Sequence, residues 1–229
     1  MARQEGVAPE STYPFGKGGF SITSLEEATE KRYLPTAYLE KIKNTPSENP
    51  RNEYARQLFL FSYYCYGISY IDMALLTSAN IKHLEGGEYI VYKRNKIKTQ
   101  KNVAPISIKI TPQIQSLIDS LTSASPTVDD YLLPIITRSG YSGEKLYNHT
   151  YSRYGKYRKY LSELAKELGI NDFNLTSYVS RHTAAMTLQR NKVSREVISQ
   201  MLGHADLETT NVYLDSFDNS VIDEAAQVL

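Results

Sequence analysis

Apolar residues recur at helical spacing along most of the chain, which predicts a mainly helical protein. The clearest example runs from Asn52 to about Tyr66, where Gly67 interrupts the pattern. A second long segment, from about Lys145 to Leu168, ends before a glycine. One or two short helices are predicted within residues 25–43. Further helices are predicted over residues 112–121, 193–202 and the amphipathic tail 215–229. Others are predicted to begin at Tyr70, at an N-cap at Thr176 and after Asp206.

Between Asn80 and Ile110 the apolar residues alternate instead of following a helical period. Gly86-Gly87 is a turn signal, and alternation is seen over residues 89–93 and again over 103–108. This pattern predicts a small antiparallel sheet. The expected fold class is therefore mainly α with a small antiparallel β-sheet (α+β).

The composition is that of a globular protein. Its 229 residues, 41% of them hydrophobic, fit one large domain or two small ones, and Met1 to Ser24 read as a linker rich in Gly, Pro and Ser. The single Cys65 excludes a disulfide framework and suits a reducing compartment. With no signal peptide and no apolar run of membrane-span length, we expect a cytoplasmic protein that does not bind a membrane.

Positive charge is local rather than global, because the formal net charge is only +1. The segment KRNKIKTQK, between the second and third expected strands, carries five cations, more than a solvated turn needs. The long helix at 145–168 presents further cations away from its apolar stripe, while its tyrosines Tyr147, Tyr151 and Tyr154 have the spacing of core residues rather than of a base-stacking platform. The candidate DNA-backbone contacts are Lys93, Arg94, Lys96, Lys101, Arg153, Lys156 and Lys159.

The last third of the chain holds a constellation suited to attack on a phosphodiester. Arg181 interrupts an apolar helix stripe that includes Tyr178, and no acidic residue lies within a turn of it, which favours an anion from outside the chain. Gly203 is a good helix-ending residue, so His204 is expected at a helix terminus. Tyr213 follows about two turns into the next helix. Taken alone, each of these residues has an ordinary structural explanation.

Three spaced motifs resemble the signature of the tyrosine recombinases, the phage integrase superfamily. They are Y-x-x-R-H at 178–182, L-G-H at 202–204 and T-T-x-x-Y at 209–213. The sequence YLDSFD at 213–218 resembles integrases of Bacteroides-type mobile elements and conjugative transposons. The resemblance implies the tyrosine recombinase catalytic-domain fold over residues 29–229, with 1–28 as the linker from a preceding core-binding domain.

The resemblance also implies an activity: cutting and rejoining DNA through a 3′-phosphotyrosyl intermediate. Tyr213 would be the nucleophile, Arg181 and His204 would bind the non-bridging oxygens, and Lys98, with Lys96 as the second choice, would protonate the 5′ oxygen. Tyr178 stands where many relatives have His and could donate a hydrogen bond. No metal or nucleotide cofactor is expected; the expected partners are double-stranded DNA and other copies of the chain, as a tetramer on DNA and a monomer alone.

The chain departs from the family at one expected phosphate-binding position. Most relatives have an arginine near Gly67, where this chain has Tyr66 and Ser69. Arg56, in A-R-Q-L-F-L-F-S, resembles an upstream arginine of Bacteroides-type integrases that is thought to substitute, and a solvated helix charge is an equal alternative. A catalytically weakened protein is a second possibility. Two other functions stay open: a DNA-binding regulatory module that has lost catalysis, and a type IB topoisomerase-like strand transferase.

Overall fold

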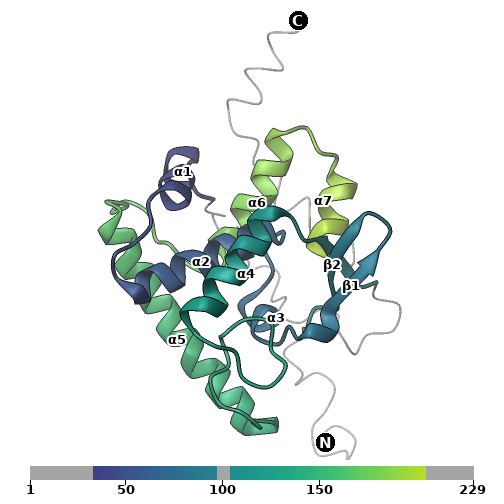
Figure 1. Cartoon of the computed structure of the whole chain (residues 1–229). Helices are drawn as coiled ribbons and strands as arrows, with labels where there is room; N and C mark the ends of the chain where they lie inside the picture. The colour runs from purple at the N-terminus through teal and green to yellow at the C-terminus, as the bar shows by residue number, and fades with distance from the viewer. Residues whose placement is uncertain (1–32, 97–103, 205–229) are drawn as a thin grey trace, which may run out of the picture. The chain divides into compact units, whose positions relative to one another are not determined.

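The computed structural model describes residues 33–96 and 104–204 (Figure 1). These residues belong to one compact unit that begins at Arg32. The predicted linker at 1–28, the candidates Lys98, Lys101 and Tyr213, and the amphipathic tail lie outside the described residues.

The described part of the chain is mostly helical with one small sheet, which confirms the predicted fold class. In chain order the elements are α1 (Thr36–Asn44), α2 (Pro50–Tyr64), α3 (Tyr70–Ala74), the 3₁₀ helix η3 (Ser78–Asn80), β1 (Ile81–Leu84), β2 (Gly87–Tyr92), β3 (Ile106–Lys109), α4 (Pro112–Ala124), α5 (Gly143–Glu167), α6 (Val179–Arg190) and α7 (Arg195–Leu202).

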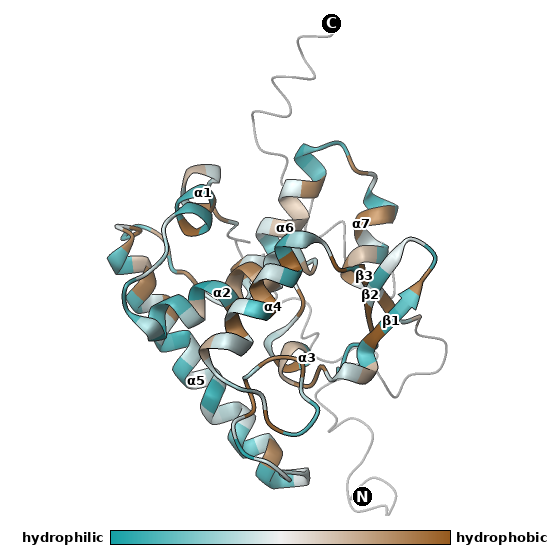
Figure 2. Ribbon diagram, viewed as in Figure 1, coloured by the Kyte–Doolittle hydropathy of each residue, from teal (hydrophilic) through white to brown (hydrophobic). Residues whose placement is uncertain are grey.

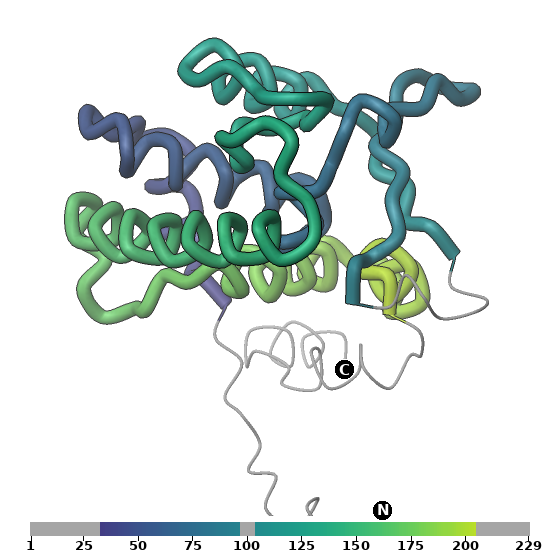
Figure 3. The backbone as a smooth tube through the Cα atoms, turned by 90° about the horizontal axis from the view of Figure 1, so that it is seen from below, coloured from purple at the N-terminus to yellow at the C-terminus, as the bar shows by residue number. Residues whose placement is uncertain are grey.

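Helix α2 is the centre of the helical part, because it packs against α1, α4, α5 and α6. Its Leu58, Phe59 and Phe61 are fully buried. Figure 3 shows α2 and α5 running side by side, with α6 continuing beneath them. The apolar residues of α2 therefore meet partners on several sides, whereas the surface of α5 is largely hydrophilic (Figure 2).

Helix α2 ends two residues before the predicted boundary because two consecutive residues take left-handed backbone conformations. Tyr66 has φ 58° and Gly67 has φ 72°. The Gly67 N–H donates to the carbonyl of Ser62 at 2.7 Å, which closes the helix end. The chain then turns, and Ser69 caps α3 by accepting from the N–H of Asp72.

The sheet is antiparallel with strand order β1-β2-β3, as the alternating pattern predicted. Glu85 and Gly86 form the two-residue turn between β1 and β2, and Gly86 and Gly87, the first residue of β2, both have positive φ. Strand β3 buries Ile106 and Ile108, and it packs against α7. This contact sets the sheet beside the end of α7 (Figure 1).

Arg56 is a structural residue on α2, buried at 8% exposure. Its Nε and Nη2 each donate to the Glu53 carboxylate at 2.7 Å, and its Nη1 donates to the carbonyls of Ile42 and Lys43 at the end of α1. The guanidinium thus fastens α1 to α2. The interpretation of Arg56 as a phosphate ligand overlooked the carboxylate one turn earlier on the same helix.

Glu53 gives this clamp a pH dependence. Partial burial alone would raise the pKa of Glu53, but hydrogen bonds from Arg56, the Ser47 N–H and Gln57 hold that pKa below its ordinary value. Because the folded pKa is the lower one, the stabilisation by Glu53 is complete above the unfolded pKa, about 4.3, and is lost as the pH falls through the folded value.

We therefore expect Glu53→Gln to lower the free energy of unfolding at about pH 7, and we expect its difference from wild type to shrink at about pH 3. Urea unfolding of both proteins at the two pH values measures this. Glu48→Gln, at an exposed position nearby, is the matched control. A Glu53→Gln difference of the same size at both pH values would contradict the assignment.

Candidate active site

Arg181 lies in the first turn of α6 and is 4% exposed. The predicted N-cap at Thr176 is wrong: its carbonyl accepts from the Val179 N–H in a turn, and the helix begins at Val179. Residues 179–186 are all buried, because α6 lies between α2 and α7, so the predicted single apolar stripe is not observed. Arg181 is thereby enclosed by neighbouring elements.

The Arg181 guanidinium lies between the C-terminal ends of two helices. Its Nη1 donates to the carbonyl of Gly67, just after α2, at 3.2 Å. Its Nη2 donates to the carbonyl of Leu202, the last residue of α7, at 2.6 Å. Helix C-termini carry partial negative charge, so they stabilise a buried cation there. The sequence argument considered only carboxylates as internal partners and missed these carbonyls.

His204 contacts the same guanidinium, at 2.9 Å between Nη2 and the imidazole Nε2. An arginine can only donate, so Nε2 accepts and the imidazole is neutral in this arrangement. The His204 N–H donates to Ser199 and the Gly203 N–H donates to Gln200, which is the hydrogen-bond pattern of a Schellman motif. Gly203 in the left-handed conformation confirms the predicted helix end and fixes His204 beside Arg181.

Two glycines allow this close packing. A Cβ atom at Gly67 would lie 2.3 Å from the Cα of Arg181, and one at Gly203 would lie 2.4 Å from Cδ1 of Ile106 on β3. Both glycines also have positive φ. The backbone of the α2 end therefore touches α6, and that of the α7 end touches the sheet.

Beside Arg181 lies a cavity of about 320 Å³. Its wall is mostly aromatic and apolar, with two guanidinium groups and no carboxylate among its residues. The lining comprises Gly67, Ile68, Ser69, Tyr70, Ile71, Arg94, Tyr147, Thr150, Tyr151, Tyr154, Ser177, Tyr178 and Arg181. Such a site can receive an anionic group at its arginine end and flat apolar groups elsewhere.

Three tyrosines of this wall are exposed, contrary to the predicted core positions. Tyr147 is 66% exposed, Tyr151 is 70% exposed and Tyr178 is 53% exposed. Apart from Thr150, the buried residues of α5 lie at Tyr157 and beyond it, so the N-terminal part of this long helix packs against less of the protein. Tyr147 and Tyr151 stack on each other at 6.4 Å, and Tyr178 meets the ring of His182 edge-on at 4.8 Å.

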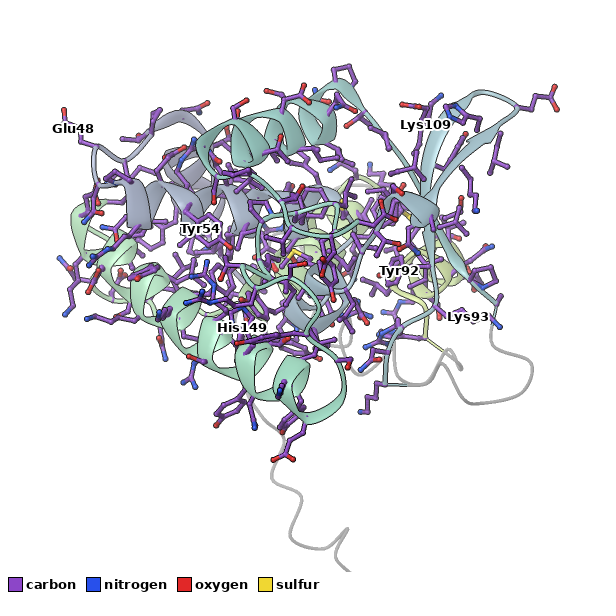
Figure 4. The ribbon with its side chains drawn as sticks, turned by 60° about the horizontal axis from the view of Figure 1, so that its bottom comes forward. Glu48, Tyr54, Tyr92, Lys93, Lys109 and His149 are labelled. Atoms are coloured by element: carbon purple, nitrogen blue, oxygen red, sulfur yellow. The ribbon has the colours of Figure 1, made fainter. Side chains whose placement is uncertain are left out.

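The candidate DNA contacts separate into exposed and engaged cations. The exposed cations are Lys93, Lys96, Lys156 and Lys159. Figure 4 shows Lys93 near Tyr92, at the end of strand β2. Arg153 is engaged: its Nε donates to the carbonyl of Ile135 at 3.2 Å, and its guanidinium lies 5.8 Å from the Tyr54 ring centre. Arg153 therefore fastens the loop before α5 rather than facing solvent freely.

Asp72 was missed by sequence reasoning. Its Oδ1 accepts from the backbone N–H of Asn95 at 2.7 Å, and its Oδ2 accepts from the Ser69 hydroxyl at 2.7 Å. The carboxylate fixes the first part of the basic connection, residues 93–101, against α3. The Ser-x-x-Asp spacing at 69–72, typical of a helix start, was the available signal.

Arg56 lies away from this site. It is absent from the cavity wall, and eight residues of helix separate it from Tyr64, a rise of about 12 Å.

Within residues 33–96 and 104–204 there is also no helix with the length and apolar content to cross a bilayer, and no cluster of three His, Cys, Asp or Glu side chains that could hold a metal ion.

The sequence from residue 32 to residue 220 matches the model of the Phage integrase family. The chain belongs to the phage integrase family. Among relatives of this family, tyrosine recombinase XerD of Brucella suis biovar 1 (strain 1330) is 26% identical over 117 residues, which cover 50% of this chain and 34% of the relative. The XerD protein of Halalkalibacterium halodurans is 42% identical over 55 residues, 24% of this chain and 18% of that protein. The aligned parts thus span between 18% and 34% of these relatives.

Solved structures of integrase-family proteins share the fold. The XerA recombinase crystal structure gives a TM-score of 0.60 at 20% identity and covers 88% of this chain and 65% of its own. The Tn1549 transposon integrase in complex with transposon right end DNA gives 0.64 at 12% identity, with coverages of 99% and 76%. These likenesses confirm the predicted tyrosine recombinase catalytic-domain fold.

The contact between Gly67 and Arg181 predicts that Gly67→Ala is strongly destabilising. The variant combines left-handed backbone strain of about 1 to 2 kcal/mol with overpacking of about 1 to 3 kcal/mol. Gly140→Ala is the matched control, because Gly140 has φ 71° and nothing within 4 Å of an added Cβ. Urea unfolding should show the larger loss for Gly67→Ala by at least about 1 kcal/mol; equal losses would show that the packing is not tight.

Proposed function

We propose that this chain is the catalytic part of a site-specific DNA recombinase or integrase. The observation that carries the proposal is the hydrogen-bonded pair of Arg181 and His204, fixed at two helix ends beside a cavity without carboxylates. Membership of the phage integrase family supports it.

In the proposed reaction the phenol oxygen of Tyr213 attacks the phosphorus and the bond from phosphorus to the 5′ oxygen breaks. Arg181 and His204 bind the non-bridging oxygens, where negative charge accumulates in the transition state. Lys98 gives a proton to the departing 5′ oxygen, and the phenol proton passes to solvent. Attack of another strand's 5′ hydroxyl on the phosphotyrosine reverses these steps. Tyr213 and Lys98 are assigned from sequence motifs alone, since both lie outside the described residues.

The proposed substrate is double-stranded DNA. The XerH and Tn1549 structures that resemble this chain are DNA complexes. On this chain the exposed Lys93, Lys96, Lys156 and Lys159 would bind phosphates without reading sequence. We further propose a Bacteroides-type mobile-element integrase acting in the cytoplasm, a tetramer on DNA and a monomer alone, with residues 1–28 as a linker to a DNA-clamping domain.

A second candidate function is a DNA-binding module without catalysis. It is favoured by the lack of an arginine near Gly67, where this chain has Tyr66 and Ser69, and by Tyr178 where many relatives have histidine. The two functions differ in one product, a covalent bond between protein and DNA.

We expect this covalent product from a pool of nicked duplexes with randomised sequence around the nick. The nick lets the short 5′-ended strand diffuse away after cleavage, so the phosphotyrosyl product accumulates and can be recovered in detergent and sequenced. Wild type should capture DNA and Tyr213→Phe should capture none. The amount captured by Arg181→Ala should be at least about 100-fold below that of wild type. Tyr160→Phe, a partly buried tyrosine on α5 outside the cavity wall, is the control and should capture DNA like wild type. No capture by wild type, or capture by Tyr213→Phe, would contradict the enzymatic function.

A further inference from the structure

We propose that Arg94 is the second guanidinium of the phosphate site. It has the role that an arginine near Gly67 has in most family members, where this chain has Ser69. This inference rests on the proposed function. It replaces the earlier assignment of Arg94 to a general backbone contact and removes the need for Arg56.

Arg94 and Arg181 lie at the same helix end. Arg94 Nη1 donates to the carbonyl of Gly203 at 3.3 Å, and Arg181 Nη2 donates to the adjacent carbonyl of Leu202 at 2.6 Å. Both side chains line the cavity that also contains Ser69. Two cations from distant parts of the sequence therefore meet on neighbouring peptide groups, next to the imidazole of His204.

The backbone around Arg94 is fixed on both sides. Tyr92 before it ends β2 and is buried, and the Asn95 N–H after it donates to the Asp72 carboxylate at 2.7 Å. The Arg94 side chain also packs close to Gly203, since a Cβ there would lie 3.3 Å from its Cδ. Such anchoring places the guanidinium reproducibly, which an oxyanion-binding group requires.

The cavity wall holds two guanidinium groups, and the nearby buried carboxylate of Asp72 accepts hydrogen bonds from Ser69 and the Asn95 N–H. Among the described residues, none of the ion pairs involves Arg94, and the cavity wall contains no carboxylate. One hydrogen bond to a carbonyl uses one of its five N–H donors. Two guanidinium groups at one helix end repel each other, and a phosphate between them would relieve that repulsion and take up the remaining donors.

Ser69 explains why the second cation comes from the strand connection. Its hydroxyl donates to Asp72 and accepts from the Asp72 N–H, so it serves as the cap of α3. Ser69 supplies no positive charge to the cavity wall that it lines. Arg94 is the described cation of the connection that reaches this wall, whereas Lys93 and Lys96 are exposed and do not line it.

The test compares Arg94→Ala with Lys109→Ala, which changes an exposed cation on β3 outside the cavity wall, on a nicked duplex selected by wild type from the randomised pool. The cleavage rate at saturating DNA and the DNA dissociation constant are measured for each protein. We expect Arg94→Ala to cleave about 100-fold to 1000-fold more slowly than wild type, with a dissociation constant changed only a few fold. The control Lys109→Ala should leave both the dissociation constant and the saturated cleavage rate near wild type.

A second substrate distinguishes charge neutralisation from simple loss of structure. A methylphosphonate at the scissile position lacks one negative oxygen, so it needs less positive charge in the transition state. On this duplex the deficit of Arg94→Ala relative to wild type should shrink by about 10-fold or more. A merely misfolded site would keep the same deficit on both substrates.

The outcomes separate the two proposals. If wild type captures no DNA from the pool, the proposed function fails and the role of Arg94 fails with it. If wild type cleaves and Arg94→Ala cleaves within about threefold of it, or if the deficit is unchanged on the methylphosphonate, only the Arg94 inference is overturned. A large loss for Arg56→Ala at equal folded fraction would also overturn it, in favour of Arg56.

Discussion

One buried guanidinium joins several parts of this protein through hydrogen bonds. Arg181 binds the carbonyls that end α2 and α7, so the helical core and the helix that supports the sheet share a polar contact. A buried cation is tolerated there because helix C-termini present several carbonyls without partners inside their own helix. The same contacts that make the charge stable also orient it, so stability and candidate chemistry use one set of hydrogen bonds.

Two glycines show that this arrangement allows few residue types at some positions of the sequence. Gly67 and Gly203 each combine a left-handed backbone with a neighbour too close for any side chain. At these positions the chain needs both the conformation and the missing Cβ. The geometry around Arg181 and His204 is therefore imposed by backbone packing rather than by the arginine alone.

Local signals allowed much of the fold to be predicted. The glycine after α7, the Thr-Pro start of α4 and the alternation in β2 and β3 act within a few residues, and these four elements are present. The predictions failed where the outcome depended on distant neighbours. Helical spacing grouped Tyr147 and Tyr151 with the core but could not tell where the partner elements stop.

In the candidate site, too, local motifs were predictive and contacts between distant elements were not. Spaced motifs brought Arg181 and His204 to one site, and the structure places them in contact. The local similarity around Arg56 did not indicate the direction of its side chain, which Glu53 and the end of α1 determine. Arg94 and Asp72 gained their places from the folding of the sheet connection onto α3 and α7, which no short motif encodes.

The bonds of Arg181 also bear on protein synthesis. Its two carbonyl partners lie 114 residues before it and 21 residues after it in the sequence. A nascent chain on the ribosome cannot complete this pocket until translation has passed His204, because the α7 end is needed to hold the guanidinium. The pocket around Arg181 therefore forms only after the whole segment from Gly67 to His204 has been synthesised.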